Sequence, residues 1–305
     1  MITVVDAKKP PAPHGSSNAS AAPLGPEGAL RTVGPFAMVA HHQAPATEPG
    51  SLPVDADVRP HPHIGLTAIS YILEGSITHR DSLGNRCELH AGDVGATVAG
   101  RGVVHSERLE RNRLMGSALE MFQLLLALPD GYEEVEPTFF LRRQAELPLV
   151  ASEGATVRWL FPTPPQAPVG MPATSPLLLA DVALVQDARW AVPEAPERAL
   201  YVLHGEVEVG KARVRAGQVA LAEPEELSVR AVDSARLLAF GGAGIGARYM
   251  WWNYIHSSLE HIEAAKAAWR QGRVRLPSGD TESFTPCPAD DGRPLLRLNH
   301  PAARR

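Results

Sequence analysis

Cysteine is scarce in this sequence: 305 residues include only Cys87 and Cys287, which lie far apart in the chain. Two isolated thiols exclude a disulfide framework and a zinc site built from cysteines. An excess of positive charge is absent as well, since 29 basic residues stand against 34 acidic ones and the formal net charge is -5. Proteins that bind nucleic acid directly normally carry a basic surplus, so we expect no such partner.

Long apolar segments are also missing from the sequence. The stretch PLLLADVALV is short and contains Asp181, whereas a helix that spans a bilayer needs roughly 20 predominantly apolar residues. The first residues, MITVVDAKKPPAP, lack the basic start and the apolar core of a secretory signal. We therefore predict a cytoplasmic protein with no membrane partner.

The strand and turn signals along the chain predict an all-β protein. Short runs rich in β-branched and apolar residues, such as LTAISYILEGSITHR, alternate with turn sequences such as DSLGN and HAGD. Many short strands with regularly spaced turns are typical of a sandwich or a barrel. Because a chain of this length exceeds what one hydrophobic core usually supports, we expect two domains.

Composition sets the expected boundaries of these domains. Residues 1–30 are dominated by Pro, Ala, Gly and Ser, which predicts a flexible N-terminal arm. The first strand series occupies residues 31–150 and the second occupies 151–275. A proline-dense stretch at 161–176 predicts a loop, and the polar residues 276–305 predict an extended tail.

Weak internal repeats relate the two strand series. SYILEGSITH (70–79) matches LYVLHGEVEV (200–209), and AGDVGAT (91–97) matches AGQVALA (216–222). A repeated pattern of this kind predicts that the second domain has the same fold as the first.

Residues 257–272 (SSLEHIEAAKAAWRQG) break the strand pattern and predict a helix near the C-terminus. Ser257 and Glu260 fit a capping box at its start, and Gly272 is placed to end it. Leu259, Ile262 and Ala265 form one apolar stripe. We expect this helix to pack on the sheets, with an interface role as the alternative.

Histidine occurs in a pattern that suits a metal ion. His61 and His63 are separated by one residue, as are His105 and Glu107, so within a strand each pair points to one face. If the two strands pair or face each other, three imidazoles and one carboxylate converge. Imidazole binds iron, zinc, copper and nickel, and an added carboxylate with open positions favours Fe(II) or a related divalent ion. The alternative is four unrelated surface or core side chains.

At this point the sequence resembles a known family. HPHIGLTAISYILEGSITHRDSLGN (61–85) and GDVGATVAGRGVVHSE (92–107) resemble the signature of the pirin family in the cupin superfamily. MWWNYIHSSLEHIEAAKAAWRQG (250–272) resembles its C-terminal signature. The resemblance implies two stacked cupin β-barrel or jelly-roll domains with a C-terminal helix, and a mononuclear iron in the N-terminal domain. The ligands that it implies are His61, His63, His105 and Glu107.

The sequence departs from the family pattern beside these motifs. Ala96 and Thr97 replace an aromatic residue and a methionine that many pirins have there. Thr67 stands where cupins often have a glutamate, and strand parity predicts that it points to the ligand side. In VAHHQ (39–43), which replaces an Asp-His-Phe sequence, His41 and His42 are expected either beside the ligands or on the surface.

The second strand series lacks both ligand pairs. No His-x-His precedes LYVLHGEVEV and no His-x-Glu follows AGQVALA, so His204 is an isolated histidine. We therefore predict one metal ion per chain and a structural role for the second domain.

Two functions follow from the resemblance. Some pirins resemble flavonol (quercetin) 2,3-dioxygenases, which implies an oxidoreductase with a small aromatic substrate and Glu107 as a catalytic base. Other pirins resemble redox- or metal-dependent regulators that bind a transcription factor or a metabolic enzyme, which implies a protein partner. An apolar cavity beside the metal favours catalysis, and a shallow or filled site favours regulation.

Overall fold

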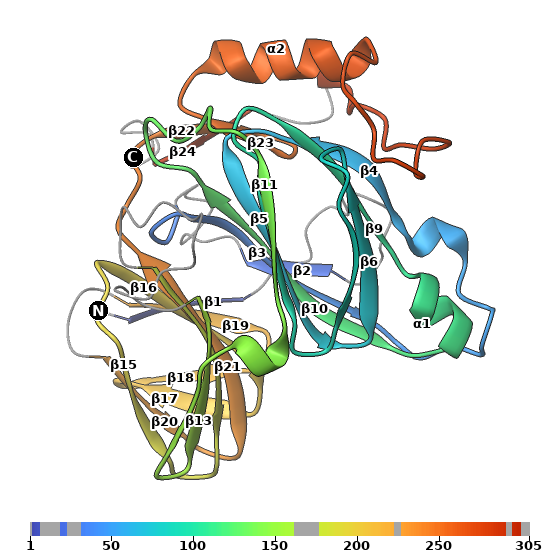
Figure 1. Ribbon diagram of the computed structural model, residues 1–305. Helices are drawn as coiled ribbons and strands as arrows, with labels where there is room; N and C mark the ends of the chain where they lie inside the picture. The colour runs from blue at the N-terminus through green and yellow to red at the C-terminus, as the bar shows by residue number, and fades with distance from the viewer. Residues whose placement is uncertain are drawn as a thin grey trace. The chain divides into compact units, whose positions relative to one another are not determined.

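The computed structural model describes residues 2–6, 19–22, 32–161, 177–222, 227–290 and 295–299. These residues are mostly in β-strands, so the all-β prediction is confirmed (Figure 1). The chain divides into two compact units. One comprises residues 1–8, 20–38 and 145–245, and the other comprises 9–19, 39–144 and 246–305. We call the second, which contains all the predicted metal ligands, the histidine unit.

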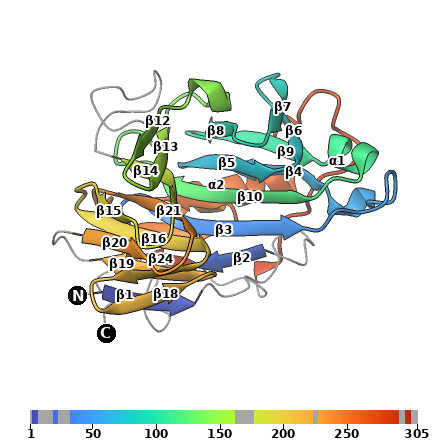
Figure 2. The same ribbon diagram turned by 90° about the horizontal axis from the view of Figure 1, so that it is seen from below.

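The histidine unit contains most of two sheets, which have the strand orders β11-β8-β5-β10-β3-β2 and β4-β9-β6-β7 among the described residues (Figures 1 and 2). The strands of the first are β2 (Ala19–Ala22), β3 (Phe36–Ala44), β5 (Leu66–Glu74), β8 (Val94–Val98), β10 (Leu119–Ala127) and β11 (Thr138–Arg142). Those of the second are β4 (Val58–His63), β6 (Ser76–Asp81), β7 (Arg86–His90) and β9 (Val103–Arg108). Ile72 and Met121 from one sheet share an apolar cluster with Ile77 and Leu89 from the other, so the two sheets enclose one core.

Short helices and a third sheet complete the histidine unit. The helices are η2 (Val54–Ala56), α1 (Glu110–Met115), α2 (Leu259–Arg270) and, at the unit boundary, η3 (Gln144–Glu146). The third sheet has the order β23-β22-β24, with β22 (Arg248–Trp251), β23 (Tyr254–His256) and β24 (Leu296–Leu298). None of the described helices combines the length and apolar character needed to cross a bilayer.

The other unit also contains two sheets in its described residues, with the orders β1-β19-β16-β21-β14-β13-β12 and β15-β20-β17-β18. The strands of the first are β1 (Ile2–Asp6), β12 (Leu149–Ser152), β13 (Ala155–Phe161), β14 (Leu178–Leu184), β16 (Glu197–His204), β19 (Gln218–Ala222) and β21 (Ala235–Gly242). Those of the second are β15 (Arg189–Val192), β17 (Glu206–Val209), β18 (Ala212–Arg215) and β20 (Leu227–Ala231). Small aliphatic side chains such as Val202, Val207 and Val229 fill the core.

The predicted repeat is visible in the strand pairing. β5 lies between β8 and β10 in one unit, and β16 lies between β19 and β21 in the other. Each central strand ends at a glycine with positive φ, Gly75 at +80° and Gly205 at +77°. A β-carbon would approach a backbone carbonyl oxygen to 2.2 Å at Gly75 and to 2.4 Å at Gly205. Only glycine fits these two turns, which explains why the sequence repeat keeps it.

The ends of the chain differ from the predicted arm and tail. Within residues 1–30, Ile2–Asp6 form β1, which pairs antiparallel with β19. Ile2 and Val4 pack against the core of their unit, so this alternating segment is a strand despite its proline-rich neighbours. In the tail, Leu296–Leu298 form β24. Most of the arm and the loop predicted within 161–176 lie outside the described residues.

The predicted C-terminal helix exists, and Ile262 and Ala265 of the predicted apolar stripe pack in the core, but the capping box does not form and Leu259 is exposed. α2 has Ser258 as its N-cap, and no side chain caps it. The hydroxyl of Ser257 donates instead to Glu133 at 2.5 Å. The buried side chains are Ile262, Lys266 and Trp269, whereas Leu259 is exposed. Lys266 is buried because its ammonium lies 4.6 Å from the Trp251 ring centroid and pairs with Glu263 and Asp290.

Gly65 joins β4 to β5, and we expect its replacement to be costly. Its φ is +63°, and a β-carbon there would come within 1.9 Å of the Ile255 carbonyl oxygen. Gly84 is the matched control, because its φ is +99° but open space surrounds it. Gly84→Ala should cost about 1–2 kcal/mol for the backbone conformation alone, and Gly65→Ala distinctly more. Thermal unfolding of both variants measures the difference, and equal shifts would contradict the packing argument.

Candidate metal centre

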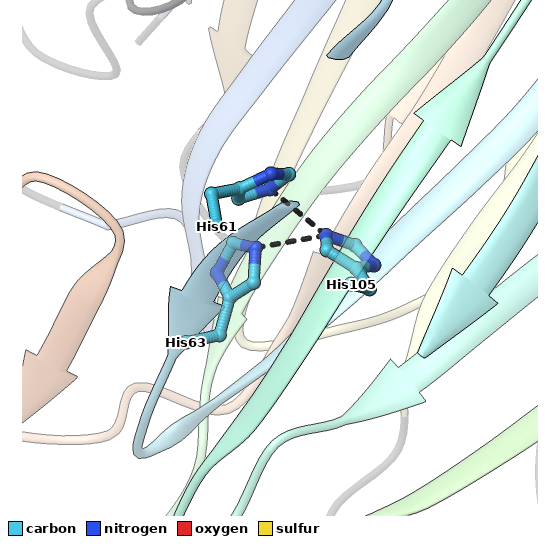
Figure 3. A group of neighbouring side chains, drawn as sticks. All are labelled: His61, His63 and His105. Carbon is cyan, nitrogen blue, oxygen red and sulfur yellow. Dashed lines mark hydrogen bonds between the residues drawn. The ribbon is translucent and has the colours of Figure 1, made fainter. Parts of the chain in front are cut away.

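Three histidines meet between β4 and β9. The two strands pair antiparallel with His61 opposite His105, after a register shift between Val58 and His61. Because alternate residues share a face, His63 projects beside His61. Figure 3 shows the three rings pointing toward one another, two from β4 and one from β9. Their ligand atoms all lie within 4.8 Å of one another, so the structure brings these predicted residues together.

The hydrogen bonds around the rings fit a bound cation. Nδ1 of His61 lies 2.9 Å from the Arg59 carbonyl oxygen, and Nδ1 of His63 lies 3.2 Å from that of Asn253. A carbonyl only accepts, so each Nδ1 carries the proton and each neutral ring has a lone pair on Nε2. Nε2 of His105 is 2.9 Å from that of His63 and 3.0 Å from that of His61. One proton on His105 satisfies only one neighbour, whereas a metal ion satisfies all three nitrogens.

The three histidines are buried, and burial keeps His61 uncharged. His61, His63 and His105 are 5%, 3% and 1% exposed. Burial lowers the pKa of His61 to about 4; the hydrogen bond with the Arg59 carbonyl opposes this shift and the charge of His79 adds to it. Near neutral pH the His61 ring is therefore uncharged and retains its lone pair.

Glu107 follows His105 on the same face of β9 but falls outside the group of three close ligand atoms. Its carboxylate accepts a hydrogen bond from the Ser70 hydroxyl at 2.5 Å. Burial raises the pKa of Glu107, while the Ser70 hydrogen bond and the charge of His79 lower it by less. The carboxylate therefore lies beside the histidines, held by β5 across the core.

Glu107 lines a cavity of about 490 Å³ in the histidine unit, whereas the three histidines are not among its described lining residues. Most of its wall is apolar, from residues that include Leu52, Ala56, Ile77, Leu109, Leu119 and Met121. Gln123 and His42 add polar groups. Burial, together with the charge of His41, lowers the pKa of His42 to about 4. The cavity has the size and composition of sites that bind small organic molecules.

Two residues that the sequence placed near the site lie elsewhere. Thr67 and Ser70 are three positions apart on β5, so their side chains lie on opposite faces of the strand. Because Ser70 contacts Glu107, Thr67 faces away from it, and the predicted orientation was wrong. The left-handed turn at Gly65 separates β4 from β5, and strand parity does not carry across it. His41 is buried, with Nε2 2.8 Å from Glu120 and its ring stacked on Phe122.

Sequence reasoning missed His79 on β6, which pairs with Glu107 in the sheet register. Its ring lies 5.4 Å from that of His105 and stacks on Phe139 at 4.1 Å. Nε2 lies 3.1 Å from Asp81. Burial alone would raise the pKa of Asp81, but hydrogen bonds from His79 and Asn85 outweigh it and lower the pKa. The i, i+2 spacing of His79 and Asp81 could have indicated a polar face on this strand. The sequence does not show, however, how β6 is aligned with β9.

The opposite face of β9 is fixed by the C-terminal tail. The Ser106 hydroxyl donates to Asp280 at 2.6 Å, and the Arg108 guanidinium binds the same carboxylate through two nitrogens. The backbone N–H of Thr285 donates to the Pro60 carbonyl oxygen at 2.9 Å, beside His61 on β4. Both strands that carry histidines are therefore held from behind by residues of the tail.

A second group, Glu134, His256 and His261, also has close ligand-type atoms. Nδ1 of His256 accepts the backbone N–H of Ser258 at 2.9 Å, so the neutral ring carries its proton on Nε2, which faces Glu134 at 2.8 Å. The His256 and His261 rings stack within 4° of parallel at 4.3 Å. Parallel stacked rings cannot both direct a lone pair at one ion, so this group fits a hydrogen-bond cluster better than a metal site. In the other unit, His204 is exposed at the end of β16.

Two family models match the sequence. The model for pirin matches residues 17–126, and the model for the pirin C-terminal cupin domain matches residues 179–275. A pirin-like protein of Caulobacter vibrioides is 39% identical over 85% of this chain and 91% of its own length. A Pseudomonas aeruginosa protein, provisionally named as a quercetin 2,3-dioxygenase, is 32% identical over 83% of this chain and 79% of its own length.

Solved structures share the fold. A crystal structure of quercetin 2,3-dioxygenase from Acinetobacter baumannii matches with a TM-score of 0.76 at 23% identity, covering 94% of this chain and 95% of that one. A bacterial pirin from Escherichia coli in complex with nickel(II) matches with a TM-score of 0.60 at 20% identity, covering 80% of this chain and 99% of that one. Both matches support the cupin fold predicted from the sequence.

Loss of one central histidine should abolish metal binding. His105→Ala removes the nitrogen that contacts both other rings, so the affinity should fall by more than the roughly 10–100-fold that loss of an outer partner costs. His90→Ala is the control, because its side chain is 47% exposed on β7. Elemental analysis and competition with a chromophoric chelator measure both. One tightly bound equivalent in His105→Ala would contradict the assignment and direct attention to the Glu134 group.

Proposed function

Because this chain belongs to the pirin family, we propose that it is a mononuclear iron cupin that acts as a flavonol (quercetin) 2,3-dioxygenase. The observation that carries the proposal is the mostly apolar cavity of about 490 Å³, whose lining includes Glu107, two residues after His105 on β9. A filled or shallow site would have favoured the regulatory alternative. The names of several relatives support the same reaction class.

His61, His63, His105 and Glu107 would hold the metal. Three imidazoles with one carboxylate suit Fe(II) or another divalent transition ion, and the nickel complex of a bacterial pirin supports this class of ion. When bound, the ion supplies a positive charge that makes a nearby hydroxyl more acidic. The outer hydrogen bonds from His61 and His63 to backbone carbonyls keep both rings in the tautomer that the site needs.

The cavity wall suits a flat aromatic substrate. Leu119, Met121 and Ala56 offer apolar surface, while Glu107 and Gln123, which both contact the Ser70 hydroxyl, supply oxygen atoms. An aromatic body in the cavity would displace water from these walls and bring a hydroxyl to Glu107. The pocket would therefore orient a small aromatic substrate with its polar edge toward Glu107.

Glu107 is the residue that we assign to proton transfer. Its raised pKa, caused by burial, makes the carboxylate a better proton acceptor than an exposed glutamate. The Ser70 hydroxyl occupies one carboxylate oxygen at 2.5 Å, which fixes the orientation of the group. The other oxygen can then accept a proton from a substrate hydroxyl.

The experiment that tests the proposal is aerobic incubation of the iron-loaded protein with a flavonol panel. We expect substrate loss, and a product that contains both atoms of one O₂ when ¹⁸O₂ is supplied. Parallel samples loaded with nickel and with zinc identify the active ion. Iron-loaded protein that turns over none of the panel would overturn the dioxygenase assignment and favour the regulator.

Glu107→Gln should separate metal binding from turnover. Glutamine keeps the size and an oxygen ligand but cannot accept the proton. We expect most of the iron to remain bound and kcat to fall by about 10²-fold or more, the scale of a lost general base. Metal content and flavonol turnover are measured on the same samples. Wild-type turnover in iron-loaded Glu107→Gln protein would rule out the role assigned to this carboxylate.

Filling the cavity should weaken substrate binding without affecting the metal. Ala56 lines the cavity from η2, and Val54 in the same short helix is 62% exposed and does not line it. We expect Ala56→Phe to raise KM for a flavonol by about tenfold or more, and Val54→Phe to leave it unchanged. Metal content should equal that of the wild type in both variants. An unchanged KM in Ala56→Phe would mean that the substrate binds elsewhere.

A further inference from the structure

Ser70 lies between two acceptors but has one hydroxyl proton. Its Oγ is 2.5 Å from Oε1 of Glu107 and 3.2 Å from Oε1 of Gln123. A hydroxyl bonded to a carboxylate is typically 2.5–2.7 Å away, and such a charge-assisted bond is the stronger of the two. The proton of Ser70 therefore belongs to the bond with Glu107.

Gln123 can satisfy Ser70 only as a donor. A half-turn of its amide about the terminal bond leaves the shape of the side chain unchanged and presents the NH₂ group to Ser70 Oγ. The hydrogen bonds then run in one direction, from Gln123 to Ser70 and from Ser70 to Glu107. In the described part of the chain Ser70 is the only partner of the Gln123 amide, so its carbonyl oxygen remains available.

In this orientation the carbonyl oxygen points away from Ser70, and the residue that carries it lines the cavity. Gln123 lines the cavity together with Glu107, and both lie on the walls that β10 and β9 contribute. Among the described lining residues Glu107 is a carboxylate without a cationic partner, since Arg59 pairs with the exposed Asp55, and none is a lysine or an arginine. Together Glu107 and the Gln123 carbonyl oxygen offer hydrogen-bond acceptors, which suits an uncharged ligand that carries donors.

We propose that Gln123 determines specificity by accepting a hydrogen bond from a free hydroxyl of the ligand, next to the group that faces Glu107. The inference rests on the proposed function, because it takes the cavity as the substrate site. It narrows the substrate class to neutral aromatic molecules with at least two hydroxyl groups. Methylation of the ligand hydroxyl that donates to Gln123 would leave the Gln123 carbonyl oxygen without a hydrogen bond, and the added methyl group would clash with the cavity wall.

The test is a methyl-ether scan of binding without turnover. Isothermal titration under anaerobic conditions compares quercetin with each of its single O-methyl ethers, on metal-loaded protein. In the wild type we expect at least one ether to bind tenfold or more weakly than quercetin. That tenfold difference corresponds to about 1.4 kcal/mol. In Gln123→Leu the carbonyl oxygen is gone, so the same ether and quercetin should bind within about threefold of each other.

Gln43→Leu is the matched control, because Gln43 also lines the cavity but donates to Glu120. It should keep the wild-type pattern. If Gln123→Leu loses its metal, the unbranched Gln123→Met replaces it in the same comparison. The inference is overturned if a metal-loaded Gln123 variant keeps the wild-type discrimination, or if the wild type binds quercetin and every ether alike or binds none of them.

The role of Gln123 and the dioxygenase assignment are tested by separate measurements, so one can be wrong while the other holds. Flavonol turnover with unchanged discrimination in the Gln123 variant would leave the dioxygenase assignment standing and remove the role of Gln123. Lost discrimination without turnover in the wild type would leave Gln123 as a specificity residue of a site that binds aromatic hydroxyl compounds without oxidising them.

Discussion

The histidine unit depends on one constraint, which is that Nε2 of His105 is held about 3 Å from Nε2 of both His61 and His63. Neutral rings with lone pairs directed at one point repel each other, so the arrangement needs either a cation or rigid support. The protein supplies support from every side. Backbone carbonyls of Arg59 and Asn253 fix two rings, and the pairing of β4 with β9 fixes the third. The surrounding core excludes water that would otherwise solvate the lone pairs.

The sequence revealed those features of the fold and the site that depend on local spacing. The i, i+2 separation was enough to place His61 and His63 on one face of β4, and to place His105 and Glu107 on one face of β9. The repeated glycines at Gly75 and Gly205 likewise predicted two copies of one fold. In each case one physical rule, strand alternation or the left-handed turn, connects the sequence to the structure.

Features that depend on the register between distant strands were not readable. His79 lies beside Glu107 only because β6 pairs with β9 at that offset, and Ser70 reaches Glu107 from another sheet. Thr67 was assigned to the wrong face because one left-handed residue, Gly65, resets the alternation. The start of α2 was missed for a related reason: Ser257 binds Glu133, a partner 124 positions away, instead of capping the helix.

The hydrogen bonds of Ser106 and Arg108 to Asp280 also determine an order of events during synthesis. Ser106 precedes Asp280 by 174 positions, so the strands that carry the histidines leave the ribosome long before the residues that hold them. At translation rates of about 5–20 residues per second, this interval is on the order of 10 s or more. During that time the nascent chain contains the three histidines but not the Asp280 carboxylate that holds β9. The histidine cluster therefore reaches its final, supported geometry only after nearly the whole chain has been synthesised.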